Sequence, residues 1–303
     1  MTRLVIVTPP DFEPLQRLRD HGVPFFAADN IESLRPALAD AEAMMSAPRY
    51  APLLREILPH AKRLRWLHTL SAGVESLPFD ELLGRDIVVT NSRRIYAEAL
   101  GEFGIAAMLW FAKDLRRLVH NQAARRWEPF TVERLEGKSV GIIGYGGIGH
   151  AIGRRAEALG MRVLPVSRRE GNIDAVIPES DYVALSTPLT HATRGLMSAA
   201  RIAKMRTSAV LINVSRGLVV DEPALVDALR NRRIRGAALD VFETEPLPSD
   251  HPFWTLDSVL LSPHSADNTA DGHEIAMRFF LENLGRFERG EPLQNIVDKA
   301  EQY

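Results

Sequence analysis

The 303-residue sequence contains no cysteine, which excludes disulfides, thiolate nucleophiles and cysteine-ligated metals. It also lacks a long hydrophobic run. The longest, IAAMLWFA at 105–112, is far shorter than a membrane span, and the apolar start at 4–7 is shorter than the core of a signal peptide. The net charge of −2 gives no electrostatic reason to expect nucleic acid or an anionic membrane as a partner. We therefore expect a cytoplasmic protein.

Short runs of Val, Ile and Leu alternate with amphipathic stretches along the chain, which is the pattern of parallel α/β folds. The length is sufficient for two domains. Strands are predicted at 4–9, 41–47, 63–71, 86–92, 139–144, 162–167, 181–187, 209–215, 236–242 and 258–263. Helices are predicted at 14–22, 53–61, 98–123, 148–160, 222–232 and 271–290. The helix at 98–123 is apolar nearly all round in its middle, so we expect it to be buried, partly against another subunit.

A glycine-rich loop, Gly144-x-Gly146-x-x-Gly149, joins a predicted strand to a predicted helix. In this context the first glycine permits a tight turn, the second lets the backbone approach a pyrophosphate, and the third lets helix and strand pack closely. The N–H groups and the dipole of the helix then favour an anion. A tight turn without a ligand is the alternative, but the strand–loop–helix context favours dinucleotide binding.

The end of the next strand selects the cofactor. NAD-binding versions of this motif place an acidic residue there, about 20 residues past the loop, where it takes the ribose 2′-hydroxyl. This chain has Ser167, Arg168 and Arg169 instead. Two guanidinium groups suit a 2′-phosphate, because arginine pairs with phosphate in a bidentate manner. The sequence therefore favours NADP(H), and a solvated arginine pair beside an NAD(H) site is the alternative.

Three polar residues each follow a predicted strand: Arg216 in NVSRG, Glu245 in DVFETEPL and His264 in LLSPHSA. Because ligands of an open parallel sheet bind beyond the carboxyl ends of its strands, these side chains can converge on one crevice. Taken singly, each residue would be assigned to a surface ion pair or to a turn. Their occurrence together, downstream of the glycine loop, favours a catalytic set.

This set fits hydride transfer to a ketone that lies beside a carboxylate. The carbonyl oxygen gains negative charge as the hydride arrives, and His264 can protonate it because histidine titrates near neutrality. Glu245 can orient the imidazole and favour its charged form. Arg216 can bind the carboxylate and polarise the carbonyl.

At these residues the sequence resembles the D-isomer-specific 2-hydroxyacid dehydrogenase family, in particular NADP-type members of the glyoxylate/hydroxypyruvate reductase kind. The resemblance covers most of the chain and rests on several long, ordered motifs. These motifs are SAGVES (71–76), RLEGKSVGIIGYGGIG (134–149), PLTHATRGL (188–196), LINVSRGLVVDEPAL (211–225), ALDVFETEPLP (238–248) and FWTLDSVLLSPHSA (253–266).

The resemblance implies an α/β fold in which a Rossmann dinucleotide-binding domain is inserted into a flavodoxin-like substrate domain, with the active site in the cleft. We place the substrate-binding (catalytic) domain at 1–93 and 270–303 and the NAD(P)-binding domain at 94–269. The family also implies an NAD(P)-dependent oxidoreductase acting on CH–OH donors. It further implies a homodimer joined through the Rossmann domain around the long helix matching 98–120.

Further site residues are carried over from the family. Backbone amides of Ala72, Gly73 and Val74 are expected to hold the substrate carboxylate together with Arg216. Asp240 is expected to contact the nicotinamide amide. The segment Ser186, Thr187 and Pro188 is expected to pass the adenosine ribose. The complete predicted cofactor site is Gly144, Tyr145, Gly146, Gly147, Ile148, Gly149, Ser167, Arg168, Arg169, Thr187, Pro188, Val214, Asp240 and His264, and no metal site is predicted.

The chain departs from the family pattern between Arg169 and Asp181. The family usually places a further strand and a short helix there, whereas REGNIDAVIPES leaves room for little more than one brief strand. We therefore predict a trimmed, more open wall beside the adenine.

The sequence thus predicts a reductase that transfers a hydride between NADP(H) and a small 2-oxoacid or D-2-hydroxyacid. The substrate is expected to be glyoxylate- or hydroxypyruvate-like, or a bulkier 2-oxoacid. Two alternatives stay open at this point. One is a dinucleotide-sensing scaffold without turnover, and the other is a related dehydrogenase of another small acid such as formate or phosphite.

Overall fold

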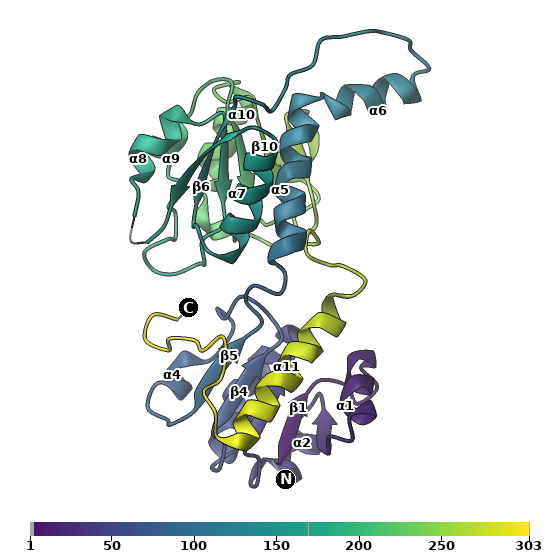
Figure 1. Ribbon diagram of the computed structural model, residues 1–303, viewed down its shortest axis with the longest axis vertical. Helices are drawn as coiled ribbons and strands as arrows, with labels where there is room; N and C mark the ends of the chain where they lie inside the picture. Colours follow the sequence, from purple (N-terminus) through teal and green to yellow (C-terminus); the bar gives the residue numbers. More distant parts are fainter. Residues whose placement is uncertain (1–2, 169, 303) are drawn as a thin grey trace. The chain divides into compact units, whose positions relative to one another are not determined.

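The computed structural model describes residues 3–168 and 170–302. The chain forms two compact units, the first from 1–96 together with 269–303 and the second from 97–268. Each unit contains one parallel β-sheet with helices packed on it (Figure 1). The predicted fold class is thereby confirmed.

The sheet of the first unit has the strand order β2-β1-β3-β4-β5, which is the flavodoxin-like order. Its inner strands are short, mostly apolar and buried along their whole length, as expected of a parallel sheet covered on both faces. The strands are β1 (Leu4–Val7), β2 (Phe25–Ala28), β3 (Ala43–Ser46), β4 (Trp66–Thr69) and β5 (Val88–Asn91).

Helices cover both faces of this first sheet. They are α1 (Gln16–Asp20), α2 (Ile31–Leu38), α3 (Leu54–Ile57), α4 (Phe79–Leu82) and α11 (Gly272–Arg289), with 3-10 turns η1 (Glu13–Leu15), η2 (Pro48–Leu53) and η3 (Leu58–His60). On one face α1 and α11 pack on alternate strand residues, and Phe280 stacks on Trp66 at 5.2 Å between ring centroids. On the other face α2, α3 and α4 contribute to a second core. The chain end returns to β5, where Val297 N–H donates to Val89 O at 2.8 Å.

The second unit has a six-stranded sheet with the order β11-β10-β9-β8-β6-β7. Its strands are β6 (Ser139–Ile143), β7 (Arg162–Val166), β8 (Tyr182–Leu185), β9 (Val210–Asn213), β10 (Gly236–Leu239) and β11 (Val259–Leu261). Helices α5 (Ala97–Ala112), α6 (Leu115–Ala123), α7 (Gly147–Ala158), α8 (Ile173–Val176), α9 (Ala199–Ile202) and α10 (Glu222–Arg230) belong to this unit, with 3-10 turns η4 (Ile177–Glu179), η5 (Gly217–Val219) and η6 (Pro252–Thr255).

The prediction of one helix over 98–123 is wrong, because the chain breaks between α5 and α6. Asp114 adopts a left-handed conformation with φ 48°, which aspartate tolerates better than most residues, and its carboxylate caps α6 by accepting from Arg117 N–H. α5 packs closely on α7, since a Cβ at Gly101 would lie 2.8 Å from Ala151 Cβ. The centre of α5 is only partly buried, and Ile105 and Trp110 keep intermediate exposure.

The short segment before β8 forms a helix rather than the predicted brief strand. Asn172 caps α8 by accepting from Asp174 N–H at 2.9 Å, and η4 follows directly. Within the described residues 167–168 and 170–181 no strand is added outside β7, so β7 is the edge of the sheet. Pro165, in the middle of β7, is compatible with an edge because it lacks the N–H of a ladder bond. The trimmed wall beside the adenine stays a prediction, with which this sheet edge is compatible.

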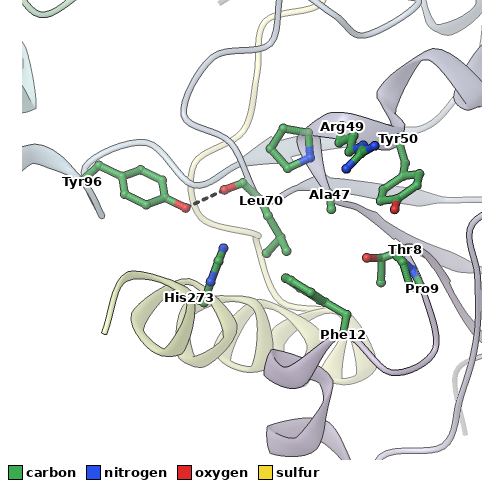
Figure 2. A pocket seen from close by; sticks show the side chains of 10 residues that line it. Thr8, Pro9, Phe12, Ala47, Arg49, Tyr50, Leu70, Tyr96 and His273 are labelled. Atoms are coloured by element: carbon green, nitrogen blue, oxygen red, sulfur yellow. Dashed lines mark hydrogen bonds between the residues drawn. The ribbon is translucent and has the colours of Figure 1, made fainter. Parts of the chain in front are cut away.

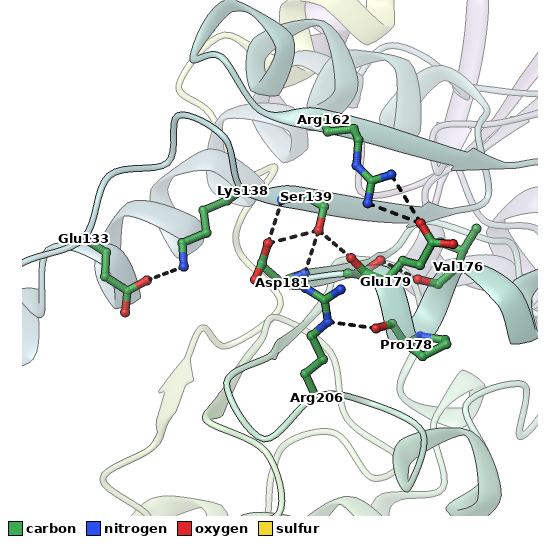
Figure 3. Close-up of polar contacts among 10 residues, drawn as sticks. Glu133, Lys138, Ser139, Arg162, Val176, Pro178, Glu179, Asp181 and Arg206 are labelled. Carbon is green, nitrogen blue, oxygen red and sulfur yellow. Dashed lines mark hydrogen bonds and ion pairs between the residues drawn. The ribbon is translucent and has the colours of Figure 1, made fainter.

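A polar network joins the starts of β6 and β8 (Figure 3). The Asp181 carboxylate accepts from Ser139 N–H at 2.8 Å and from Ser139 Oγ at 3.0 Å. Arg162 pairs with Glu179 at 3.2 Å, and Arg206 Nε donates to Pro178 O at 2.8 Å. These contacts fix the amino ends of the strands and leave the carboxyl ends to the candidate site.

Candidate active site

The structure places Arg216, Glu245 and His264 beyond the carboxyl ends of β9, β10 and β11, which are neighbours in the sheet. His264 Nδ1 and Glu245 Oε2 lie 2.6 Å apart, so two of the three predicted residues form a direct pair. The other carboxylate oxygen of Glu245 accepts from Phe242 N–H at 2.9 Å. Both side chains remain partly exposed, at 43% for His264 and 34% for Glu245, so a ligand can reach them.

The pair shifts the pKa values of both partners. The hydrogen bond and the negative charge of Glu245 raise the pKa of His264 above 6.5, although burial and the charge of Arg216 oppose this. Burial alone would raise the pKa of Glu245, but hydrogen bonds from His264 and the Phe242 amide, with the charges of His264 and Arg216, lower it. The pair therefore favours an imidazolium beside a carboxylate.

Arg216 sits on a tight turn after β9. The Asn213 amide donates to Arg216 O at 3.0 Å, and the Asn213 side-chain oxygen accepts from Ser215 N–H at 3.0 Å. Gly217 follows, and a Cβ there would lie 1.8 Å from the carbonyl carbon of Phe242, so only glycine fits. This close approach places the Arg216 turn against the turn that carries Glu245. The Arg216 guanidinium donates to Ser215 O at 2.7 Å.

Asp240 has a role that the sequence analysis missed. Its Oδ1 accepts from Ser262 Oγ at 2.5 Å, Ser265 N–H at 2.9 Å and Ala266 N–H at 3.0 Å. These bonds bracket His264, whose own backbone is left-handed at φ 51°. Asp240 is almost fully buried, and among the described residues its Oδ2 makes no hydrogen bond, which leaves an acceptor of the kind an amide group needs.

Two further acidic residues near the catalytic turns were also missed. Glu222 accepts from Glu243 N–H at 3.1 Å and pairs with His251 at 3.2 Å, which supports the turn before Glu245. Burial and the charge of Asp240 raise the pKa of Asp267, three residues after His264. Glu222 lies within the motif at 211–225, but residue type alone does not single out either acid, because their roles depend on contacts between distant segments.

The glycine loop has the local geometry that the motif predicts. Gly144 has φ 99°, and a Cβ there would lie 2.7 Å from Thr187 N, while one at Gly149 would lie 2.5 Å from Gly144 O. A Cβ at Gly146 would meet nothing within 4 Å, so this glycine faces open space. Gly146 is the N-cap of α7, and no side chain caps the free amides of the first turn, which include those of Gly147 and Ile148.

The neighbouring strands supply the other predicted cofactor contacts. Thr187 Oγ1 is buried without a hydrogen-bond partner in the described chain, beside the Gly144 turn, so this hydroxyl needs a ligand group. Pro188 O accepts from Thr193 Oγ1 at 2.6 Å, and Val214 is buried beside β8. The Tyr145 ring packs on His150 at 4.2 Å between centroids, so the residue is anchored to α7.

The predicted cofactor-selecting residues form a tight turn after β7. Ser167 N–H donates to Glu170 O at 2.8 Å, and Glu170 N–H donates to Ser167 Oγ at 3.0 Å. Arg168 lies in this turn, whereas Arg169 lies outside the described residues. Of the described residues at this strand end, 166–168, none is acidic.

In the first unit the loop after β4 has the properties expected of a carboxylate-binding backbone. Asn91 Nδ2 donates to Ala72 O at 2.6 Å, and Ser71 Oγ donates to Gly73 O at 2.5 Å. The amides of Ala72, Gly73 and Val74 have no acceptor among the residues that the structure describes. Side chains therefore hold the carbonyls and leave these N–H groups available to an anion.

Among the described residues, no group of three or more His, Asp or Glu side chains is arranged as a metal ion would require. No described helix combines the length and apolar character needed to cross a bilayer.

The parallel sheet, the glycine loop and the paired His–Glu define a dinucleotide-binding oxidoreductase. The family model for the D-isomer specific 2-hydroxyacid dehydrogenase NAD binding domain matches residues 105–266. A glyoxylate reductase from Korarchaeum cryptofilum is 34% identical over 266 residues, which cover 82% of this chain and 80% of that protein. The chain therefore belongs to the D-isomer specific 2-hydroxyacid dehydrogenase family, whose members are oxidoreductases acting on CH–OH groups.

Solved structures agree with this assignment. A D-isomer specific 2-hydroxyacid dehydrogenase family protein from Aeromonas salmonicida has a TM-score of 0.86 at 27% identity and covers 98% of this chain and 99% of its own. A D-isomer specific 2-hydroxyacid dehydrogenase from Xanthobacter autotrophicus, in complex with NADPH and MES, has a TM-score of 0.82 at 28% identity and covers 100% and 99%. The predicted family and enzyme class are thus confirmed.

Proposed function

We propose that the chain is an NADPH-dependent reductase of small 2-oxoacids, forming D-2-hydroxyacids. The observation that carries this proposal is the 2.6 Å His264–Glu245 pair at the strand ends next to the Arg216 turn. We assign cofactor binding to the second unit and substrate recognition to the first. The names of the relatives, among them glyoxylate reductases, support a substrate of this class.

The chemistry follows from the positions of the side chains. NADPH, when bound, supplies the hydride. Glu245 holds Nδ1 of His264, so Nε2 is the atom that gives a proton to the developing alkoxide. Arg216 holds the substrate carboxylate and polarises the carbonyl, and the amides of Ala72, Gly73 and Val74 are the first unit's contribution to carboxylate recognition.

The cofactor would be held by groups that fit a dinucleotide. The open space at Gly146 and the free amides of the first α7 turn suit a pyrophosphate, and the unpaired Thr187 hydroxyl suits a ribose. Asp240 Oδ2 suits the carboxamide. Burial of these groups and exclusion of water strengthen their electrostatic interactions.

The preference for NADP(H) rests on the turn after β7. Ser167 replaces an acid there, and Arg168 brings a cation that suits a 2′-phosphate. The NADPH complex of the Xanthobacter structure is in line with this preference. Ser167→Asp should shift the NADPH/NADH ratio of kcat/KM toward NADH by roughly tenfold or more, because a carboxylate repels the phosphate and accepts from the 2′-hydroxyl.

Initial rates test the function directly. We expect NADPH oxidation with glyoxylate, hydroxypyruvate, pyruvate or a branched or aromatic 2-oxoacid, and Arg216→Gln should lower kcat/KM by roughly 100-fold or more. Arg230→Gln, an exposed arginine of α10, is the matched control. Near-normal turnover by the Arg216 variant on every 2-oxoacid, or NADPH binding without turnover by the unaltered protein, would overturn the proposal. Formate and phosphite with NADP⁺ cover the related dehydrogenase alternative.

We also propose a homodimer formed by the second unit. The α6 arm, residues 113–134, projects away from the rest of this unit (Figure 1). It exposes Leu118 by 47%, Val119 by 59% and Trp127 by 97%, which is unusual for large apolar side chains that have no partner. A second copy of the same arm region is an occupant that would cover this surface.

A further inference from the structure

A cavity of about 290 Å³ opens in the first unit, at a place where parallel α/β sheets bind ligands. In the order β2-β1-β3-β4-β5 the connections leave β1 and β3 in opposite directions, and the crevice beyond their carboxyl ends is the usual ligand site. Thr8 directly follows β1, Ala47 directly follows β3 and Leu70 directly follows β4, and all three line the cavity. The volume suits a small molecule or part of one.

The polar groups of this cavity are cationic or neutral, and no acidic side chain lines it. In Figure 2, Thr8 and His273 point toward a space bounded by Phe12 and Leu70, and His273 comes from the first turn of α11. Thr8 is almost fully buried as a residue, and its hydroxyl makes no hydrogen bond among the described residues. The hydroxyl is not fully enclosed by protein, because it borders the cavity, so it can hydrogen-bond to a molecule bound there.

Arg49 adds a positive charge to the same cavity. Its guanidinium has no ion pair or hydrogen bond within the described chain. Glu274, which follows the cavity residue His273 in the sequence, is already paired with Arg17 at 3.0 Å and Arg278 at 3.1 Å. The charge of Arg49 is therefore uncompensated, which favours an anion.

The cavity also adjoins the backbone proposed to hold the substrate carboxylate. Leu70 lines it, and Ala72 follows only two residues later. The Leu70 carbonyl accepts from Tyr96 Oη at 2.8 Å, which fixes the start of this loop. A substrate whose carboxylate lies on the free amides of the loop would extend its other end toward Thr8 and Arg49.

We infer that the cavity recognises a second anionic group, at the far end of a 2-oxoacid, so that the preferred substrates are 2-oxo-dicarboxylates or phosphorylated 2-oxoacids. This inference rests on the proposed function. Arg49 supplies the charge, the Thr8 hydroxyl and the imidazole of His273 supply hydrogen bonds, and Phe12 packs on the carbon chain. These residues determine specificity and take no part in proton or hydride transfer.

Two substrates of similar shape, only one of which has a charged far end, test the effect of that charge alone. 2-Oxoglutarate and 5-methyl-2-oxohexanoate differ only in a terminal carboxylate against an isopropyl group, and 3-phosphonooxypyruvate provides the phosphate arm. We expect kcat/KM to be about tenfold or more higher for the dicarboxylate, mainly through KM, as one charge-assisted contact provides. Arg49→Gln should reduce this ratio about tenfold, and Arg49→Lys should restore part of it. Arg35→Gln, at an exposed arginine of α2, should leave it unchanged.

The outcomes separate this inference from the proposed function. A folded enzyme that reduces the uncharged isostere as well as either charged substrate, or a ratio that Arg49→Gln does not alter, would overturn the inference alone. Calorimetric titration with the same pair gives the ratio of Kd values without turnover. An Arg49-dependent preference in Kd, together with no reduction of any 2-oxoacid, would support the anion site and overturn the proposed function.

Discussion

The His264 imidazole is held by a carboxylate that also accepts from a backbone amide, so its position and its charge are set by one contact. Because Glu245 raises the pKa of His264, the protonated donor persists to a pH above 6.5. Reduction should lose rate as the pH rises through this raised pKa, and oxidation should lose rate as the pH falls through it. We therefore expect the Glu245–His264 pair to set the pH range of each direction.

Replacing Glu245 should displace the pH profile. In Glu245→Gln the imidazolium loses its main support while the charge of Arg216 still opposes it, so the alkaline limb of reduction should move to lower pH. His264→Asn should lower kcat by roughly 10²–10⁴ without abolishing NADPH binding. The measurement is kcat/KM against pH, with Glu243→Gln as the control carboxylate two residues away. A Glu245→Gln profile that superimposes on the unaltered one would contradict the assigned role.

At the level of single residues, the sequence indicated Arg216, Glu245 and His264 because each stands in a long motif at a strand end. The bonds from Asp240 to the amides of Ser265 and Ala266 were not predictable in the same way. They join segments 25 residues apart through the backbone, and backbone partners leave no trace in residue type. The shared cavity of Arg49 and His273 was likewise not predictable, since it exists only in the folded unit.

Among the helices and strands too, those with a clear local sequence pattern were predicted and the others were missed. The predicted strands of both sheets are present because short, mostly apolar runs, such as LVIV in β1 and GAAL in β10, require burial. β2 and α2 were missed, since β2 is a half-exposed edge strand and α2 contains Pro36. The break at Asp114 was missed because apolar residues continue on both sides of it, and only the left-handed backbone reveals it.

A substitution in the glycine loop tests the proposed pyrophosphate site. Gly146→Val should weaken NADPH binding roughly 100-fold, because the new side chain would enter the space proposed for the pyrophosphate, while its φ of −94° should leave folding intact. Gly84→Val, which also faces open space but lies in the first unit, is the matched control. Fluorescence titration gives Kd and thermal unfolding gives Tm. Unchanged Kd in a folded Gly146→Val protein would contradict the proposed pyrophosphate site.

For the molecule as a whole, one buried histidine links stability to pH. Burial lowers the pKa of His68 to about 3, against 6.5 when exposed, so the unfolded chain binds a proton that the folded chain refuses. Its contribution is complete above pH 6.5 and is lost as the pH falls toward 3. Between pH 7 and pH 5 the loss should be about 2 kcal/mol in the free energy of unfolding.

Denaturant titrations at these two pH values check this expectation. His68→Gln keeps a polar group near the Thr90 hydroxyl, 2.8 Å from His68 Nδ1, but cannot titrate. The difference between pH 7 and pH 5 should therefore shrink in this variant. His60→Gln, at an exposed position, should retain the full difference. An unaltered pH dependence in His68→Gln would assign the acid sensitivity to other groups.

A substitution in the α6 arm tests the proposed homodimer. Val119→Asp in the α6 arm should convert a dimer to a monomer, because burying an unpaired carboxylate in an apolar contact is strongly unfavourable. Light scattering coupled to size-exclusion chromatography measures the mass. Leu83→Asp, also at an exposed apolar position but in the first unit, should leave the mass unchanged. A monomeric unaltered protein, or a dimeric Val119→Asp variant, would contradict an interface on the arm.

The short segment before β8 affects whether copies of this protein can associate through their sheet edges at high concentration. With no described strand outside β7, a row of its backbone N–H and C=O groups faces outward. Such a row can pair with a strand of another molecule. Pro165 interrupts that row, because proline has no N–H with which an added strand could form a hydrogen bond. Pro165 thus makes this edge a poor template for a strand from another copy of the protein.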